Sequence, residues 1–367
     1  MLTPLQLVAG IWLATLPALG GASAPSSPPG ILADGSRTYR SDERAASLLA
    51  LDDEEFLQVV QADPAALGSL SIGGPGSGRL FNGVKFPEGE RWVIAPTAEA
   101  WATTETIEAI QTAIDTVHQL FPETPPIYLG DMSGRDGGRL KRHASHQCGR
   151  DADLGFYFKD GAAATLVAGT AKNLDLPRNW ALVRALVART DVESILLDTR
   201  IQRVLYRYAA SIAEDQAWLD RIFGFVRGSR DAVIKHVAGH RNHYHVRFYN
   251  PLAQELGRRA HPVLVDMQLV DPPVRTVRHL VRAGETIGRL AARYGTTVDA
   301  IMRANGLRTE RLRARRSYRI PVRAAFSPPT PFVLRPRLLP PQTPELMAGV
   351  EWPTPESLYP DAGQQER

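Results

Sequence analysis

Helical and extended apolar patterns follow one another without a regular rhythm through the middle of this chain, and this irregularity limits the folds it can adopt. From Glu105 to Leu120 apolar residues recur at helical spacing, and Pro122 ends that segment. The stretches "IKHV" and "HYHVRFY" instead alternate as strands facing one core do, and "VESILL" is a further strand candidate. Because these elements do not form regular βα units, we expect an α+β fold, with a central antiparallel sheet flanked by helices. The same criteria predict helices at 177–187, 204–212 and 217–225, and strands at "IYLGDM" and "IKHV".

The two ends of the chain differ in composition from its middle. Residues 1–24 contain an apolar run followed by small residues, which is typical of a secretory signal peptide and too short for a stable anchor. The run has no preceding Lys or Arg, and Pro25 disfavours cleavage after Ala24, so an uncleaved anchor or a misassigned start is the alternative. No other stretch is long and apolar enough to cross a membrane, so we expect a mature chain without a stable membrane span. Residues 323–367 are rich in proline and are predicted to be extended or disordered.

Three segments lie between these ends. Residues 25–68 are predicted to form a linker and an acidic helical arm, which either packs on the main domain or is a removable pro-segment. The main domain is expected at 69–256, and a second, smaller one at 277–322, after the linker-like stretch "LVDPPVRT". The single cysteine, Cys148, excludes an intrachain disulfide, so stability must come from packing and from any metal that binds.

Histidines gather in the stretch "GHRNHYHVRF". On a strand, His243 and His245 would project from one face, about 7 Å apart along the backbone. Two imidazoles on one face can bind a metal or take part in catalysis. Taken alone, such a pair is more often a surface pair or a satisfied core pair.

A second stretch, "RHASHQCGRDADLGFY", adds further side chains that can bind zinc: His143, His146, Cys148, Asp151 and Asp153. His146 and Asp153 would lie roughly 23 Å apart on one straight strand. Gly149 lies between them and permits a reversal that brings both to one point. Three protein ligands with one open position are the arrangement of a catalytic zinc ion.

Together, "HASHQCGRDAD" and "HRNHYHVR" resemble the penicillin-insensitive murein endopeptidases, within a larger group of zinc peptidases that share an H-x(6)-D and a later H-x-H element. The stretches "SIGGPGSGRLFNGV" and "IYLGDMSGRDGGRL" are similar to earlier segments of that family, so the resemblance covers about residues 69–250. It implies that residues 69–256 form a zinc peptidase domain with one Zn²⁺ ion in its catalytic site.

The resemblance also implies roles for individual residues. His146, Asp153 and His245 would bind the zinc ion. His243 would be a catalytic histidine that does not bind zinc, and His240 falls on a further family histidine near the site.

Three neighbouring positions are less defined. His143 fits the family as a pocket residue, and Asp151 is expected to be a supporting or solvated carboxylate rather than a ligand. Cys148 is expected to be a small buried residue, with a fourth zinc ligand as the alternative.

Zinc chemistry in such a site needs a partner that moves a proton. Zinc would polarise the scissile carbonyl and activate water, while a nearby group would carry the proton to the leaving amine. His243 is the candidate for oxyanion stabilisation or proton transfer. The dipeptidase relatives place a glutamate as base three positions before the last histidine, where this chain has Asn242, so the general base is unassigned.

The stretch "RAGETIGRLAARYGTTVDAIMRANGL" resembles LysM domains, which are small βααβ folds that bind N-acetylglucosamine-containing glycans. The sequence departs from that family at "RARRS", which stands in place of the usual Pro-Gly turn before the last strand. The resemblance suggests these candidates for glycan contacts: Gly284, Glu285, Thr286, Asn305, Gly306 and Leu307.

The LysM-like segment is strongly basic. Residues 278–322 contain eleven arginines and three acidic residues, which favours an anionic partner such as a cell-wall polymer, although an ordinary soluble surface is the alternative. Nucleic acid is not expected as a partner, because the chain has no recognisable nucleic-acid-binding fold.

A zinc peptidase joined to a glycan-binding module suggests one shared target, peptidoglycan, because tethering raises the local substrate concentration. We therefore expect a periplasmic or secreted zinc D,D-endopeptidase that cuts D-alanyl-diaminopimelate cross-links. The alternatives are a D,D-carboxypeptidase or dipeptidase on the same scaffold, and a non-catalytic wall-binding protein.

Overall fold

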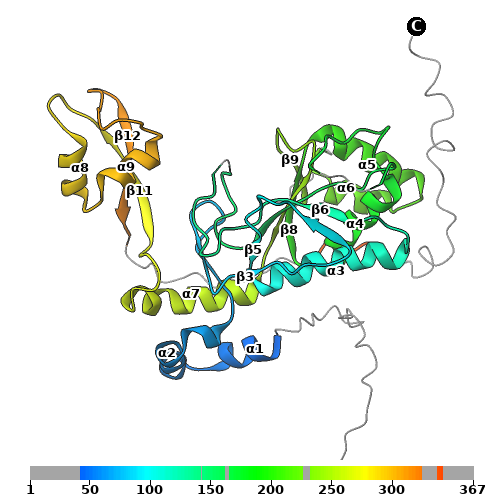
Figure 1. Ribbon diagram of the computed structural model, residues 1–367, viewed down its shortest axis with the longest axis horizontal. Helices are drawn as coiled ribbons and strands as arrows, with labels where there is room; N and C mark the ends of the chain where they lie inside the picture. Colours follow the sequence, from blue (N-terminus) through cyan, green and yellow to red (C-terminus); the bar gives the residue numbers. More distant parts are fainter. Residues whose placement is uncertain (1–41, 142, 162–164, 226–231, 325–336, 342–367) are drawn as a thin grey trace, which may run out of the picture. The chain divides into compact units, whose positions relative to one another are not determined.

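The computed structural model describes residues 42–141, 143–161, 165–225, 232–324 and 337–341 (Figure 1). The expected signal peptide at 1–24 lies outside these residues, as does most of the proline-rich segment. Within them, no helix has the length and apolar character needed to cross a membrane.

The main domain is built on a six-stranded sheet with the strand order β4-β6-β7-β10-β8-β9. The strands are β4 (Trp92–Ile94), β6 (Ile127–Leu129), β7 (Asp151–Leu154), β8 (Val192–Leu197), β9 (Ile234–His236) and β10 (Tyr244–Phe248). The four central strands are antiparallel, whereas β4 and β9 each pair in parallel with their neighbours. The predicted α+β class is therefore confirmed, and the sheet is antiparallel only at its centre.

Helical crossovers explain the two parallel pairs. Parallel strands cannot be joined by a tight hairpin and need a longer connection. Helix α3 (Thr104–Leu120) lies between β4 and β6 in the chain, and α5 (Thr199–Ser211) and α6 (Gln216–Ile222) lie between β8 and β9. The short pairs β1 (Leu70–Ile72) with β2 (Arg79–Phe81) and β3 (Val84–Lys85) with β5 (Trp101–Ala102) lie outside this sheet.

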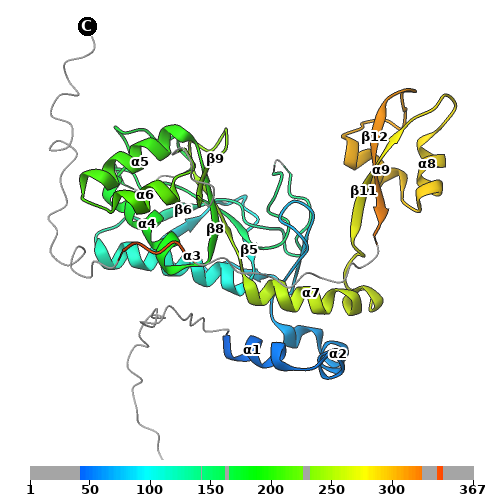
Figure 2. The ribbon, with the colours of Figure 1, turned by 180° about the vertical axis from the view of Figure 1, so that it is seen from behind.

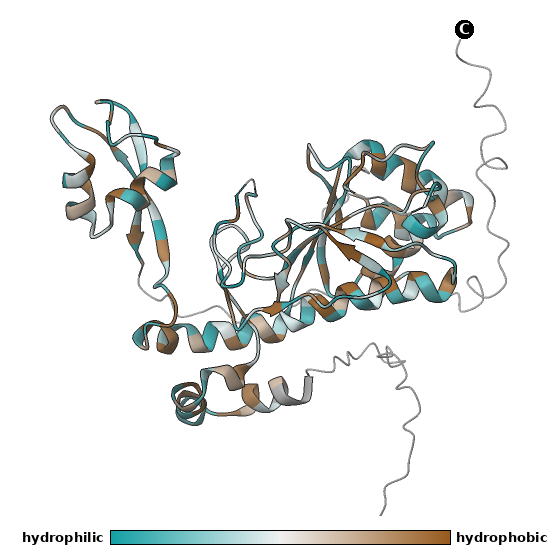
Figure 3. Ribbon diagram, in the orientation of Figure 1, coloured by the Kyte–Doolittle hydropathy of each residue, from teal (hydrophilic) through white to brown (hydrophobic). Residues whose placement is uncertain are grey.

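Helix α3 forms where the apolar periodicity predicts it. The Thr103 side chain accepts a hydrogen bond from the Thr106 amide and caps the helix start. Ile110 and Ile114 are fully buried in the main core, against α4 (Leu176–Arg189) among other elements. Figure 3 shows hydrophobic and hydrophilic residues alternating along this helix, as one buried face requires.

The acidic arm packs on the main domain through α7 (Pro251–Asp266), a helix that continues past the expected domain end at residue 256. Helices α1 (Asp42–Ala50) and α2 (Asp53–Ala62) share a second apolar core with α7 and β1, which includes Phe56 and Leu256. Arg259 of α7 lies 4.1 Å from the centre of the Phe56 ring and donates to the Leu51 carbonyl at 2.9 Å. The arm thus packs on α7 in the intact chain, and whether it is a removable pro-segment stays open.

Part of the proline-rich segment has defined contacts. Arg337 Nε lies 2.9 Å from Asp191 Oδ1, and the Asp191 side chain is buried. The Trp218 indole donates to the Leu338 carbonyl at 2.7 Å. Residues 337–338 therefore pack against the main domain (Figure 2).

The second module is a βααβ fold, as predicted: β11 (Val274–Leu280), α8 (Ile287–Tyr294), α9 (Val298–Asn305) and β12 (Ser317–Arg323). Strand β11 starts within the expected linker. The module has its own core, which includes Ile287, Leu290, Ile301 and Ile320. At the divergent "RARRS" turn, Arg315 adopts a left-handed backbone with φ of 64°, a conformation usually taken by glycine.

Candidate metal centre

Two neighbouring strands bring the motif residues to one face of the sheet. Strands β7 and β10 pair antiparallel, with His245 directly opposite Asp153 and Arg247 directly opposite Asp151. Because side chains two apart share a face, this register places all four on the same side. The D-x-D spacing of β7 and the H-x-R spacing of β10 therefore give two cross-strand pairs of polar side chains in the centre of the sheet.

His146 lies next to these pairs and comes from the loop before β7. Its backbone is left-handed, with φ of 64°, and Gly149 follows with φ of 75°, so the reversal involves the histidine itself as well as the predicted glycine. The His146 amide donates to Asp151 Oδ2 at 2.9 Å, and its carbonyl accepts from Ser133 Oγ at 2.8 Å. These hydrogen bonds hold a conformation that costs about 1–2 kcal/mol for an L residue.

Three potential ligand atoms form a nearly equilateral triangle. His146 Nε2 lies 3.1 Å from His245 Nδ1 and 3.3 Å from Asp153 Oδ1, and the latter two atoms are 3.2 Å apart. Zinc bonds of about 2.0–2.1 Å in tetrahedral geometry require ligand atoms about 3.3–3.4 Å apart. Asp153 Oδ1 is buried and has no hydrogen-bond partner among the described residues. The donor set and spacing therefore fit a zinc ion.

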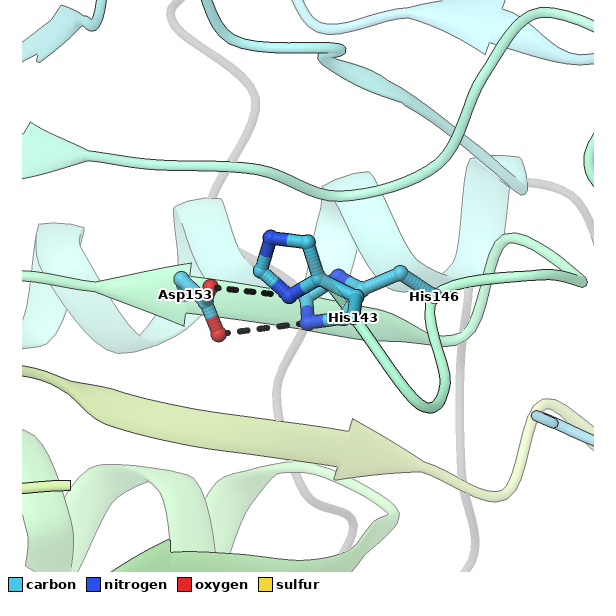
Figure 4. Close-up of side chains that lie close together, drawn as sticks. All are labelled: His143, His146 and Asp153. Carbon is cyan, nitrogen blue, oxygen red and sulfur yellow. Dashed lines mark ion pairs between the residues drawn. The ribbon is translucent and has the colours of Figure 1, made fainter. Parts of the chain in front are cut away.

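A second grouping of ligand-type atoms is His143, His146 and Asp153, whose atoms lie within 4.8 Å of one another (Figure 4). His143 Nδ1 is 3.9 Å from Asp153 Oδ2, which is longer than any edge of the His146–Asp153–His245 triangle. The triangle is therefore the better match to a single metal ion, and His143 lies beside it.

Hydrogen bonds behind the triangle fix its imidazoles. His146 Nδ1 lies 2.6 Å from the Met132 carbonyl, which can only accept, so Nδ1 carries the proton and Nε2 keeps its lone pair. His245 Nε2 lies 3.5 Å from Asp151 Oδ1, so its Nδ1 faces the triangle.

Asp151 is buried rather than solvated. Arg247 donates to both of its oxygens, at 2.6 and 3.3 Å. Burial alone would raise the pKa of Asp151, but the hydrogen bonds from His245 and Arg247 outweigh burial and hold that pKa well below its usual range. The carboxylate therefore stays charged behind His245.

Burial and neighbouring charged groups also have opposite effects on the pKa values at the triangle. Burial tends to raise the pKa of Asp153, yet the neighbouring imidazoles of His146, His245 and His243 lower it well below the usual value. Burial tends to lower the pKa of His245, yet Asp151 and Asp153 raise it to about 9. The site thus stabilises positive charge where the three ligand atoms converge.

His243 and His240 lie next to this centre. His243 Nε2 is 3.6 Å from Asp153 Oδ1, and its Nδ1 is 2.8 Å from Asn242 Oδ1. Burial lowers the pKa of His243 to about 4. The His240 ring centre is 4.9 Å from that of His243 and 5.6 Å from that of His245, and burial also lowers the pKa of His240.

One residue of the site was not predicted. Asp131, two positions beyond the end of β6, lies with its Oδ2 2.9 Å from His143 Nε2. The stretch "IYLGDM" is predicted to be a strand and lies in a family-like segment, but neither feature assigned a role to Asp131. An acidic residue just past a buried strand end is a signal that could have suggested it.

Cys148 is buried and lies outside the grouping of ligand-type atoms. It packs against the backbone of Gly78, where an added Cβ would approach its own Cβ to 2.8 Å. This environment is that of a small buried residue.

The candidate glycan-contact residues of the second module have structural partners. Glu285 is within 2.8 Å of both His279 Nε2 and the Arg282 amide, and Thr286 caps α8. Asn305 bonds both the amide and the carbonyl of Arg319. Leu307 packs against the module core, and Gly284 and Gly306 have φ of 82° and 61°.

The sequence was compared with known families and proteins. The family of penicillin-insensitive murein endopeptidases matches residues 71–266, and the LysM domain family matches residues 279–321. Among proteins of curated function, none matches the chain significantly.

Proposed function

This chain belongs to the penicillin-insensitive murein endopeptidase family, and we propose that it is a zinc-dependent D,D-endopeptidase that hydrolyses peptide cross-links in peptidoglycan. The family and the LysM domain make it a peptidase of the peptidoglycan-hydrolysing class. The finer assignment to zinc rests on the metal centre, and the assignment to D,D bonds rests on the resemblance to the family.

The triangle of His146 Nε2, Asp153 Oδ1 and His245 Nδ1, with edges of 3.1–3.3 Å, is the observation that carries the proposal. Two imidazoles and one carboxylate leave one position of a tetrahedral ion open for water or substrate, as catalytic zinc sites do. When bound, zinc would supply Lewis-acid polarisation of the scissile carbonyl and make water a better nucleophile near neutral pH.

The protein's own residues orient the ligands and can transfer protons. The Met132 carbonyl and Asp151 orient the two ligand imidazoles. His243 lies beside Asp153 with Nε2 directed at the triangle, where it can donate to or accept from the reacting groups after proton exchange. Its 15% exposed side chain, compared with 0% for His146, puts His243 on the more open side of the centre.

The LysM domain supports the choice of substrate. LysM domains bind peptidoglycan, and a tether between a binding module and a hydrolase raises the effective concentration of cleavable bonds. A periplasmic or secreted location, as residues 1–24 suggest, would give access to this substrate.

Digestion of purified cross-linked peptidoglycan, read by mass spectrometry of the muropeptides, tests the proposal. We expect the zinc-loaded protein to convert cross-linked dimers to monomers, and a chelator, His146→Ala or His243→Ala to abolish the conversion. Release of terminal D-alanine alone would replace the endopeptidase with a carboxypeptidase. Intact fragments that still bind the protein would indicate a non-catalytic wall-binding protein.

A further inference from the structure

Gly149 lies in the turn that joins His146 to Asp153, and the surrounding structure encloses it tightly. Its φ of 75° is in the left-handed region that favours glycine. An added Cβ would come within 2.6 Å of Leu80 Cδ1 and 3.1 Å of the Thr103 amide nitrogen. Because the turn carries the chain from one proposed ligand to the other, the way Gly149 is held decides where His146 lies.

The amide side of Gly149 is bonded to Ser133. The Gly149 amide donates to Ser133 Oγ at 2.9 Å, and Ser133 Oγ donates to the His146 carbonyl at 2.8 Å. One hydroxyl thus joins both ends of the turn, with its lone pair in one bond and its proton in the other. Ser133 is fully buried, so bulk water does not compete for either bond.

The carbonyl side of Gly149 is bonded to the start of α3. It accepts from the Thr103 amide at 3.1 Å and from Thr106 Oγ1 at 2.8 Å. Asn250, at the start of α7, donates to Oγ1 of Thr103 and of Thr106, in both cases at 2.6 Å. A side-chain amide has two N–H groups, so one Asn250 orients both hydroxyls.

Asn250 makes these bonds in place of the usual role of its position. Asparagine is among the preferred residues at a helix start because its side chain caps the helix. The Asn250 side chain makes no such bond to α7, whose Leu252 and Ala253 amides donate instead to the Glu105 carboxylate of α3, at 3.3 and 2.8 Å. Glu105 therefore replaces Asn250 as the cap, and the Asn250 amide is left for the two threonines.

Four buried side chains from three separate segments thus hold the Gly149 peptide groups. We call them the Gly149 clamp: Ser133, Thr103, Thr106 and Asn250. They are at most 2% exposed, so none of them reaches a substrate. Any effect they have on the site must act through the placement of His146.

We propose that the Gly149 clamp positions His146 for metal binding, so that its members are positioning residues of the metal centre. The proposal rests on the zinc site of the proposed function. His146 Nε2 lies 3.1 Å from His245 Nδ1 and 3.3 Å from Asp153 Oδ1, and a metal site needs its ligands within about 0.5 Å of the productive geometry. The clamp supplies this precision at the one ligand that comes from a loop.

Zinc affinity of the full chain, measured by competition with a chromogenic chelator, tests the clamp. Thr106→Val keeps the shape of the side chain and removes the hydroxyl, and we expect the Kd for zinc to rise about 10–100-fold. Thr106→Ser restores the hydroxyl and should bind within about threefold of wild type. Thr116→Val, on the same helix, is the matched control, because the Thr116 hydroxyl bonds only the Thr112 carbonyl of its own helix. It should keep wild-type affinity.

Co²⁺ in place of zinc reports the geometry of the ligands. Its visible absorption bands depend on coordination number and symmetry, so a displaced His146 changes their positions and intensities. We expect altered bands in Co²⁺-saturated Thr106→Val and in Ser133→Ala, which loosens the turn from its other side. Thr106→Ser and Thr116→Val should show the wild-type spectrum. A lower Tm in Thr106→Val with wild-type zinc affinity and spectrum would overturn the proposal, because the clamp would then serve stability alone.

Hydrogen exchange of the metal-free chain, read by mass spectrometry of peptides that cover residues 146–151, follows the turn itself. Loss of one hydrogen bond of usual strength should speed exchange there about five- to tenfold in Thr106→Val and in Ser133→Ala, but not in Thr116→Val. Weaker zinc binding with unchanged exchange would refute the clamp as its cause. A wild type that binds neither zinc nor Co²⁺ would overturn the zinc function together with the positioning role, whereas wild-type zinc binding in both variants would overturn the positioning role alone.

Discussion

The carboxylate of Asp151 is the most tightly held charge behind the metal centre. It is 1% exposed, accepts two hydrogen bonds from Arg247 and one from the His146 amide, and lies beside His245. A charge in this position supports folding only while its partners remain, because a buried charge without a partner is strongly unfavourable.

Asp151→Asn is therefore expected to destabilise the metal-free protein by about 3 kcal/mol, because it leaves Arg247 without its counter-charge. The orientation of His245 should also be less well defined, with zinc affinity about 10–100-fold lower. Urea unfolding and chelator competition measure the two effects. The double variant Asp151→Asn with Arg247→Gln should be more stable than Asp151→Asn alone, and a loss below about 1 kcal/mol in the single variant would contradict this account.

Arg315 of the LysM domain has a strained backbone conformation. Its φ of 64° costs an L residue about 1–2 kcal/mol, and its exposed side chain offers little packing in return. Glycine removes that strain, but its greater conformational entropy in the unfolded state destabilises the folded domain by about 0.4–1 kcal/mol. Arg315→Gly is thus expected to stabilise the LysM domain by about 0.5 kcal/mol, measured by thermal unfolding of the domain. Arg311→Gly, in the same loop without a positive φ, should destabilise it instead.

At the scale of elements, Phe56 is a central contact of the arm formed by α1 and α2. Phe56 is 3% exposed and packs between the second core and the Arg259 guanidinium. Phe56→Ala should cost about 3–5 kcal/mol by the usual loss for a buried phenylalanine, and should make the arm sensitive to limited proteolysis. Gln61→Ala, exposed on the same helix, is the control. Unchanged stability in Phe56→Ala would mean that the arm folds apart from α7.

The elements also show which features local sequence could predict. The alternation in "HYHVRFY" and the apolar spacing of α3 depend on side chains close in sequence, so β10 and α3 were predicted correctly. The convergence of His146, Asp153 and His245 followed from motif spacing together with family resemblance. Their ligand roles stay predictions.

Other features depend on tertiary context. The parallel pairing of β4 and β9 depends on which strands the crossovers join, which short strands of three residues do not reveal. Asp131 meets His143 only because β6 and β7 are neighbours. The left-handed backbone of His146 is held by hydrogen bonds to Ser133 and Asp151, and a histidine gives no local sign of it.

At the scale of the whole molecule, the peptidase and LysM domains have separate cores, so they should unfold in separate transitions. Among the described residues, the ligand-type cluster lies in the peptidase domain alone. A ligand that binds only the folded state stabilises it by about 2.7 kcal/mol when its concentration is 100 times its Kd. Metal should therefore affect one transition and leave the other as an internal reference.

Removal of zinc with a chelator is expected to lower the Tm of the peptidase transition by about 5–10 °C, because each kcal/mol shifts Tm by about 2–4 °C in a domain of this size. The LysM transition should not move, and restored zinc should return the first transition to its original Tm. Differential scanning calorimetry of the full chain resolves both. His146→Ala removes one corner of the ligand triangle and should abolish the zinc-dependent shift. A shift that persists in His146→Ala would mean that the stabilising metal binds at another site. The two remaining ligands are not expected to hold the ion at the zinc concentration used for the wild type.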